Sequence, residues 1–323
     1  MTDGNISLLL PFPPPLLSPS GRFQSFKPLR LETKTLYDEY AGLLPYALSS
    51  PLYFQSLYAW NFTSVNRYEI FEGHLCIAAE DTIRRKVFAV PPLGALDGTF
   101  ASAVGRVFSA FEKEWLLCSF YEVPDFMLPC FLSLEAYDVA VSYETDWSDY
   151  MFAKEDFCAS AEKKSQKEAI RYFKRSFDPR VREISSSDRE VVLEITKRFF
   201  CAERECSDCF CGCEMKVVSR MLQGWNELDI GGVIVESGGE AIAFGMVCRQ
   251  KDTLLFLSKK VRRKTRGLNE YLNAVLMDRF GSDCRYVNYS DDMGSEGLRS
   301  YKSRLGDHVL MHRYVVDLTR KEK

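Results

Sequence analysis

The sequence predicts an α/β protein (α+β in its layout) with two successive modules, each a mixed, mainly antiparallel sheet flanked by helices. The length supports two modules, because 323 residues are enough for two domains of ordinary size. The pattern supports the class, because both halves alternate segments of helical apolar spacing with short apolar runs and polar turns. Hydrophobic residues make up 46% of the chain, so each module can bury a core.

The segment 1–21 predicts a flexible, proline-rich tail. Prolines interrupt its apolar run after Leu10 and no basic stretch precedes that run, which disfavours a signal peptide. We place the module boundary near residue 150. The chain then divides into the tail, an N-terminal module over 22–150 and a C-terminal module over 151–323.

Charge, apolar run length and cysteine content together predict a cytoplasmic protein. The net charge of −3 provides no global basic field to attract nucleic acid or anionic lipid. No segment reaches the ~18–20 consecutive apolar residues that span a bilayer, so we expect at most peripheral membrane contact. The chain has 11 cysteines and no export signal, which favours reduced thiols.

In the N-terminal module, helical spacing places apolar residues on one face over 32–44 and 100–115. Residues 53–62 are rich in aromatics, and we expect them to pack in the core. Short apolar runs bounded by turns such as Glu72-Gly73 predict strands. The expected strands are 23–31, 68–70, 75–79, 87–90, 116–121 and 137–145.

The C-terminal module alternates in the same way, with a hairpin expected across the turn Ser237-Gly238-Gly239. The expected helices are 156–177, 187–200, 214–228, 267–280 and 295–304. The expected strands are 182–184, 232–236, 240–248, 254–258, 286–289 and 309–318. This order resembles that of GNAT-type acyltransferases, and the first module has a similar but shorter order. We therefore expect two GNAT-like modules in tandem.

The run 286–304 is the most site-like part of the sequence. A strand is expected to end in a polar turn and a helix to begin at Ser295, and ligands in α/β folds gather at such places. On that helix, acidic and basic side chains at i, i+3 and i+6 share one face. The candidate residues are Asn288, Asp291, Asp292, Glu296, Arg299 and Lys302. The alternative from composition alone is a capped amphipathic helix with solvated charges.

The end of this run, NYSDDMGSEGLRSYKSRL, resembles the C-terminal signature of the uncharacterised family related to the catalytic domain of phosphatidylglycerol lysyltransferase. The matching residues are Asn288, Asp292, Gly294, Gly297, Leu298, Arg299 and Lys302. Other stretches agree in order and spacing, among them FKPLRLETKTLYDEY, AIRYFKRSF and GGVIVESGGEAIAFGM, so the resemblance runs from about residue 26 to 318. The chain departs from the signature at Tyr289, Ser290 and Asp307, where the family usually has Arg, an acidic residue and Pro.

The resemblance implies transfer of an aminoacyl group from a charged tRNA to a lipid, peptide or small-molecule acceptor. It implies no metal and no covalent intermediate, so we expect no cofactor. The co-substrate is then aminoacyl-tRNA or, in the alternative of a coenzyme A-dependent enzyme, an acyl-coenzyme A. Such a reaction needs positioning and a cation for the developing oxyanion, a role the resemblance gives to Lys302. It also implies that Arg299 binds phosphate or carboxylate, and that Asp292 or Glu296 binds the α-amino group of the donor.

Two basic segments are candidates for contact with tRNA phosphates or another anion. The segment 259–266 contains Lys260 and Arg266 and could equally be a solvated basic loop. In the basic helix, the resemblance marks Lys167 and Arg171 as anion contacts. Coenzyme A-dependent GNAT enzymes bind the pyrophosphate with a glycine-rich loop, and the corresponding stretch of this chain retains only Gly267. The alternative hypothesis of a coenzyme A-dependent N-acetyltransferase is therefore weakened.

The cysteine-rich stretch 201–213 is dense enough for a zinc site. Its thiols belong to Cys201, Cys206, Cys209, Cys211 and Cys213. The spacing is tight for one ion and no second Cys-x-x-Cys pair is present, so we expect free thiols. A non-catalytic module that binds tRNA or a small anion remains an alternative to an enzyme, because one fold can host many functions.

Overall fold

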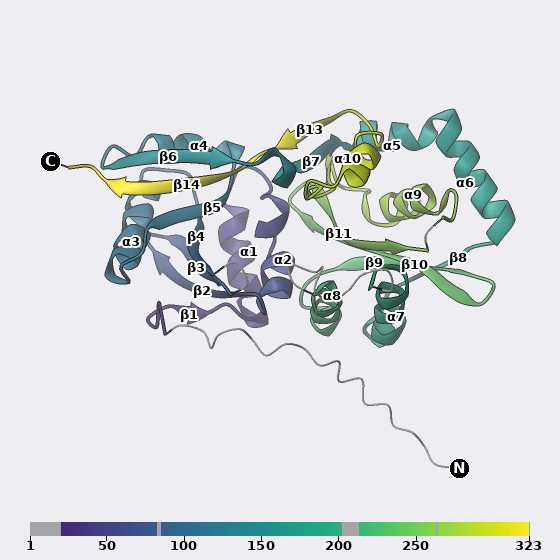
Figure 1. Cartoon of the computed structure of the whole chain (residues 1–323), viewed down its shortest axis with the longest axis horizontal. Coiled ribbons are helices and arrows are strands. Elements are labelled where there is room, and N and C mark those ends of the chain that lie inside the picture. The colour runs from purple at the N-terminus through teal and green to yellow at the C-terminus, as the bar shows by residue number, and fades with distance from the viewer. Residues whose placement is uncertain (1–20, 83–84, 202–212, 263, 323) are drawn as a thin grey trace, which may run out of the picture.

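The strands form two sheets of seven within residues 21–82, 85–201, 213–262 and 264–322, which the computed structural model describes. The first sheet has the order β1-β2-β3-β4-β5-β14-β6 and the second the order β13-β7-β12-β11-β10-β9-β8. They lie side by side along the long axis of the molecule (Figure 1). Most neighbouring strands are antiparallel, and helices flank both sheets, which confirms the predicted fold class.

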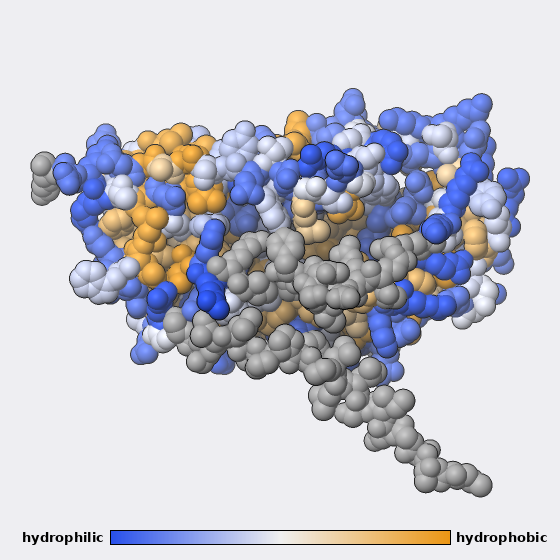
Figure 2. Space-filling view, viewed as in Figure 1, coloured by the Kyte–Doolittle hydropathy of each residue, from blue (hydrophilic) through white to orange (hydrophobic). Residues whose placement is uncertain are grey.

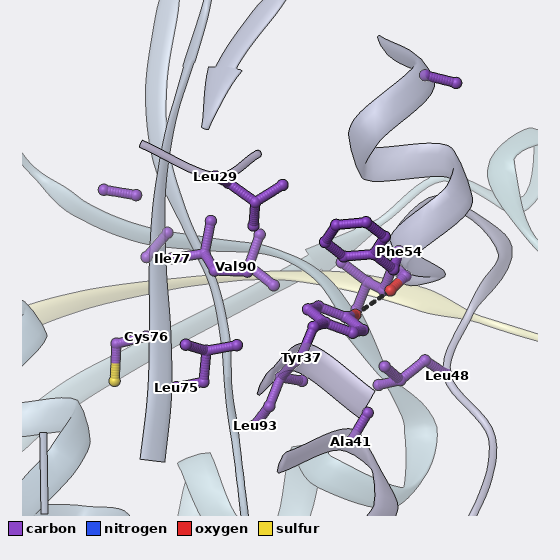
Figure 3. Close-up of a cluster of buried hydrophobic side chains, with 14 of the residues drawn as sticks. Leu29, Tyr37, Ala41, Leu48, Phe54, Leu75, Cys76, Ile77, Val90 and Leu93 are labelled. Atoms are coloured by element: carbon purple, nitrogen blue, oxygen red, sulfur yellow. Dashed lines mark hydrogen bonds between the residues drawn. The ribbon is translucent and has the colours of Figure 1, made fainter. Parts of the chain in front are cut away.

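The first sheet is built around the expected strands 68–70, 75–79 and 87–90, which pair in succession as an antiparallel meander. Its elements are β1 (Lys27–Pro28), α1 (Lys34–Gly42), α2 (Phe54–Trp60), β2 (Ser64–Phe71), β3 (His74–Asp81), β4 (Lys86–Leu93), α3 (Phe100–Lys113), β5 (Cys118–Pro124), α4 (Leu128–Leu132) and β6 (Tyr137–Tyr143). Buried apolar side chains from α1, α2, β3 and β4 meet in its core, where the Tyr37 hydroxyl donates a hydrogen bond to the Leu52 carbonyl (Figure 3). The aromatic segment 53–62 therefore contributes to the core, as expected.

The second sheet has helices on both faces. Its elements are β7 (Asp149–Ala153), α5 (Lys154–Glu162), α6 (Lys164–Phe177), β8 (Arg180–Glu183), α7 (Arg189–Phe199), α8 (Glu214–Gln223), β9 (Gly231–Ser237), β10 (Glu240–Gln250), β11 (Thr253–Val261), α9 (Leu268–Phe280), β12 (Tyr286–Asn288), α10 (Glu296–Lys302) and β13 (His308–Met311). Short 3₁₀ turns are η1 (Leu31–Thr33), η2 (Ser50–Leu52), η3 (Asp125–Met127), η4 (Thr145–Trp147) and η5 (Ser186–Asp188). The expected single helix 156–177 is two helices, because Lys163 is extended at ψ 139°.

Alternation along β9 shows how the two faces are used. Val233 and Val235 belong to the core cluster that includes α5, α6 and α9. Ile234 between them belongs to the cluster that includes α7, α8 and the first sheet. A strand buried on both faces reads as a continuous apolar run, which is the pattern of GGVIV in the sequence.

A β-bulge in β11 re-aims the side chains that follow it. Ser258 pairs with Met246 and Phe256 pairs with Val247, so Leu257 is the extra residue. Alternation shifts by one at a bulge, and Lys259 therefore lies on the same face as Phe256, toward α9. β11 pairs in parallel with β12 over only three residues, because β12 ends at Asn288 opposite Leu255, whereas β11 continues to Val261.

The chain crosses back to the first sheet at its C-terminal end. Met311 is the last residue of β13 in the second sheet, and β14 (Arg313–Arg320) lies between β5 and β6 of the first. The expected strand 309–318 is therefore two strands, joined at His312. Figure 1 shows β14 running toward the first sheet. The boundary near residue 150 stays a prediction, but the segment beyond it includes one strand of the first sheet.

No helix within the described ranges is long and apolar enough to cross a membrane.

Candidate functional site

The loop between β12 and α10 forms the first candidate site, and its backbone is sharply turned. β12 ends at Asn288, and Ser290, Met293 and Gly294 have positive φ angles of 58°, 50° and 73°. The Ser295 side chain then caps α10 by accepting a backbone hydrogen bond of 3.5 Å from the first turn. Strand end and helix start thus lie on either side of one tight polar loop.

Lys302, the last residue of α10, binds the backbone of this loop. Its Nζ donates to the carbonyl oxygens of Tyr289 at 2.6 Å, Ser290 at 3.1 Å and Asp291 at 2.5 Å. Burial lowers the pKa of Lys302 to about 8, although nearby carboxylates favour its charged form. An ammonium has three donors, so all of them are engaged with the backbone. The role of Lys302 as an oxyanion cation stays a prediction, and its observed contacts fix the loop.

Asp292 and Arg299 form an ion pair at the edge of the same loop. Arg299 Nε lies 3.0 Å from Asp292 Oδ2, which also accepts from the Tyr150 hydroxyl at 2.7 Å. Burial alone would raise the pKa of Asp292, but hydrogen bonds from Arg299, Tyr150 and the Gly294 amide hold it below its usual value. Arg299 also donates to Asp146 at 2.6 Å. Two of the predicted site residues thus bind each other.

Asp149 lies fully buried behind the loop, at the junction of the two sheets. Its carboxylate accepts from the Ser50 amide at 2.6 Å, the Ser50 hydroxyl at 2.8 Å and the Asn288 side chain at 2.8 Å. Asn288 therefore connects β12 to β7 and to η2 of the first sheet. A buried carboxylate needs such donors, since an unpaired buried charge is strongly unfavourable.

Arg313, like Ser50 and Asp149, belongs to this region although the sequence did not mark it as a site residue. Its side chain is 3% exposed, and it lies 2.7 Å from Asp291, 3.2 Å from Glu122 and 3.9 Å from Asp149. Burial would lower the pKa of Arg313, but the three carboxylates raise it above its usual value. Burial raises the pKa of Asp291, with Arg313 opposing. The only signal in the sequence was a charged residue inside the expected apolar strand 309–318.

A basic groove between α6 and the start of α9 is the second candidate site, here called the α6–α9 groove. Its volume is about 650 Å³, and both Arg171 and Arg266 line it. The lining residues are Glu168, Arg171, Tyr172, Lys174, Arg175 and Arg266. The Arg266 guanidinium lies 5.2 Å from the centre of the Tyr172 ring. Hydrophilic side chains dominate this end of the molecule in Figure 2.

The N-terminus of α9 is closely covered by α6. Gly267 caps the helix at φ 83°, and a Cβ on it would lie 2.1 Å from the Ala169 carbonyl oxygen. Only glycine fits such a position. α6 therefore lies directly against the Cβ side of Gly267.

The remaining predicted anion contacts lie outside the α6–α9 groove. Lys167 forms an ion pair with Glu162, and Lys260 forms one with Glu214 on the opposite face of the second sheet. Glu296 is exposed in the first turn of α10. The sequence therefore grouped residues that the fold separates.

The cysteine-rich stretch is only partly within the described residues. Cys201 and Cys213 are half-buried, whereas Cys206, Cys209 and Cys211 lie outside the described ranges. Among residues that are described, no group of three or more His, Cys, Asp or Glu is arranged to hold a metal ion. The preference for free thiols over zinc stays a prediction.

Comparison with known proteins gives one family and several solved folds. A family model described as phosphatidylglycerol lysyltransferase, C-terminal, matches residues 49–316. The sequence matches no curated protein.

Three solved structures share the fold over most of the chain. A conserved protein of unknown function from Bacteroides thetaiotaomicron has a TM-score of 0.81 at 17% identity, covering 91% of this chain and 99% of that one. L-PGS from Bacillus licheniformis has a TM-score of 0.62 at 11% identity, covering 88% and 90%. FemX has a TM-score of 0.60 at 8% identity, covering 88% and 95%. These likenesses establish the tandem GNAT-like fold.

Proposed function

The chain belongs to the family of the phosphatidylglycerol lysyltransferase C-terminal domain, a family of GNAT-like aminoacyltransferases, and from this we propose that it transfers an aminoacyl group from tRNA. The acceptor is an amine or hydroxyl of a lipid, peptide or small molecule. It attacks the ester carbonyl, a new C–N or C–O bond forms, and the bond to the tRNA 3′ oxygen breaks. The observation that carries this proposal is the α6–α9 groove.

The charges in the groove fit a nucleic acid backbone. Arg171, Lys174, Arg175 and Arg266 provide four cations against one carboxylate, from Glu168. Phosphate contacts supply most of the sequence-independent affinity for nucleic acids. The net charge of the chain is −3, so this local field contrasts with the rest of the surface. A tRNA would therefore bind by this end of the molecule rather than through long-range attraction to the whole protein.

Coenzyme A as co-substrate is less well supported by the same region. A pyrophosphate cradle needs free backbone N–H groups at a helix start. Beside Gly267 the nearest atom to an added Cβ would be the Ala169 carbonyl oxygen, an acceptor rather than a donor. A negative group there would meet this oxygen.

A non-catalytic tRNA-binding module is the second candidate function. One observation favours it: Lys302, Arg299 and Asp292 are engaged with the protein itself. Binding alone would need the groove and not these residues.

Charge reversal in the groove tests the proposal. We expect Arg171→Glu with Arg266→Glu to weaken binding of charged tRNA at least tenfold and to reduce its salt dependence, because each lost phosphate contact reduces the slope by about one. Binding is measured at several salt concentrations, beside acetyl-coenzyme A. Lys113→Glu with Lys197→Glu, also two reversals but at exposed lysines of α3 and α7, is the matched control. Equal loss in both double variants, or binding of coenzyme A alone, would contradict the proposal.

A further inference from the structure

A second polar cluster lies directly beside the loop described above, where β12 ends against β11. It consists of Lys259, Asn273, Tyr289 and Tyr301, here called the Lys259 cluster. These residues come from β11, α9, the end of β12 and α10, so four elements converge on it. The bulge at Leu257 turns Lys259 into it. Bulges that re-aim a side chain are common beside functional sites.

The donors of Lys259 are all used within the cluster. Its Nζ lies 2.8 Å from Asn273 Oδ1, 2.5 Å from the Tyr289 hydroxyl and 3.1 Å from the Tyr301 hydroxyl. The Tyr289 hydroxyl in turn donates to Asn273 Oδ1 at 2.9 Å. Lys259 therefore polarises two phenols instead of facing solvent with free N–H groups.

The Tyr301 hydroxyl is left with a proton to give. It accepts from Lys259 Nζ and from Asn273 Nδ2, the second at 3.1 Å, which uses both of its lone pairs. The Tyr289 hydroxyl is 3.5 Å away, beyond the ordinary O–H···O range of about 2.5–3.0 Å. Among the described residues no acceptor lies within that range, so the Tyr301 hydroxyl can donate to a ligand at the cost of only a long contact with Tyr289.

Burial decides which member a ligand meets. Asn273 and Tyr289 are buried, whereas Lys259 and Tyr301 are half-buried. The two members that keep exposed surface are thus a tyrosine and the lysine that donates to its hydroxyl. This arrangement suits an oxygen atom that carries, or acquires, negative charge.

We propose that the Tyr301 hydroxyl donates a hydrogen bond to the carbonyl oxygen of the transferred acyl group, with Lys259 and Asn273 as positioning residues. The inference rests on the proposed function and names a residue for it. When the acceptor attacks, the carbonyl oxygen gains an electron pair and the bond from Tyr301 strengthens. When the electron pair returns, the C–O bond to tRNA breaks and the 3′ oxygen takes the proton that the acceptor loses.

The cluster lies within reach of the α6–α9 groove. Arg266 lies two residues before Leu268, the first residue of α9, and Asn273 is five residues further along the helix, roughly 8 Å at about 1.5 Å per residue. Phosphates bound in the groove would thus leave the tRNA 3′ end near the cluster. Lys302 is a poorer candidate for the carbonyl, because its three donors bind backbone oxygens.

The first test compares uncleavable charged tRNA, with the amino acid amide-linked at the 3′ end, against uncharged tRNA. Alanyl, seryl and lysyl forms are tested in turn. We expect Tyr301→Phe to weaken binding of the preferred charged form about three- to tenfold, as for one lost hydrogen bond, and to leave uncharged tRNA unaffected. Unchanged binding of uncharged tRNA also shows that the variant folds. Tyr286→Phe, the same change at an exposed position of β12, is the control.

Equal affinity of the natural protein for charged and uncharged tRNA, or a Tyr301→Phe variant that keeps the preference, would overturn the inference. A second readout does not depend on tRNA. In protein labelled at the tyrosine ¹³Cζ, adenosine carrying a 3′-aminoacyl amide should shift the resonance that Tyr301→Phe removes. A shift without any tRNA binding would refute tRNA as the source of the aminoacyl group but support Tyr301 as the residue that binds the carbonyl oxygen. An unshifted resonance would refute the site.

Discussion

At the scale of single residues, two buried cations have structural partners that spacing along the sequence did not show. Lys302 binds three backbone carbonyls of one loop, and Arg313 forms ion pairs with carboxylates from three different segments. Removing one partner of such a buried set leaves charge uncompensated, which costs about 3–5 kcal/mol. Both residues therefore fix the geometry around Asn288.

The lowered pKa of Lys302 predicts a pH dependence of stability. The amine has a pKa of about 8 when folded and 10.5 in its ordinary state, so between these values the unfolded chain holds a proton that the folded chain has lost. Stability from this group therefore rises with pH in that window. We expect the unfolding free energy of the natural protein, relative to Lys302→Met, to increase by roughly 3 kcal/mol between pH 8 and 10.5.

Urea unfolding of both proteins at half-unit pH steps measures this difference. Lys197→Met, the same change at an exposed lysine of α7, controls for the loss of one positive charge. A difference between the natural protein and Lys302→Met that stays constant from pH 8 to 10.5 would show that Lys302 is not desolvated in the folded protein.

At the scale of elements, the local sequence pattern predicted most helices and strands. The predicted and observed elements differ where tertiary contacts, rather than local sequence, determine the backbone conformation. The meander of β2, β3 and β4 and the hairpin of β9 and β10 follow from alternation and turn residues. The break between α5 and α6 at Lys163 did not follow, because no glycine or proline marks it. The bulge at Leu257 also has no local signal, and it becomes visible only in the register of β11 against β10.

The contact of α6 with α9 gives a prediction with a matched control. Gly267 and Gly238 both have positive φ angles, of 83° and 60°, but only Gly267 has a neighbour, the Ala169 carbonyl, within 4 Å of an added Cβ. Gly238→Ala should cost about 1 kcal/mol of strain. Gly267→Ala should cost roughly 3 kcal/mol or more, because α6 must also move. Chemical denaturation compares the two, and equal losses would mean that α6 does not pack tightly there.

At the scale of the whole molecule, the site residues that sequence could predict are those close together in the chain. Asn288, Asp292, Arg299 and Lys302 lie within one strand–loop–helix unit, so their proximity follows from local spacing. Ser50, Asp149 and Arg313 reach the same place from η2, β7 and β14. Their arrival depends on how the two sheets are joined and on the crossing of β14, which no local pattern encodes.

The proximity of Arg171 and Arg266 likewise depends on tertiary packing rather than on local sequence. The two residues belong to basic segments that the sequence marks separately, and the packing of α6 on α9 brings them into one groove. Lys167 and Lys260, which belong to the same two segments, point elsewhere and pair with Glu162 and Glu214. Composition alone could not separate these two pairs.

The measurement that most directly tests the central claim is single-turnover loss of the aminoacyl group from labelled charged tRNA. The natural protein is in excess, and a pool of phospholipids, short peptides and free amines serves as acceptor. The account predicts that label leaves tRNA faster than by spontaneous hydrolysis and appears in one class of acceptor. It also predicts that Arg171→Glu with Arg266→Glu abolishes the acceleration. Release at the spontaneous rate, with charged tRNA bound, would contradict an aminoacyltransferase and identify a binding module.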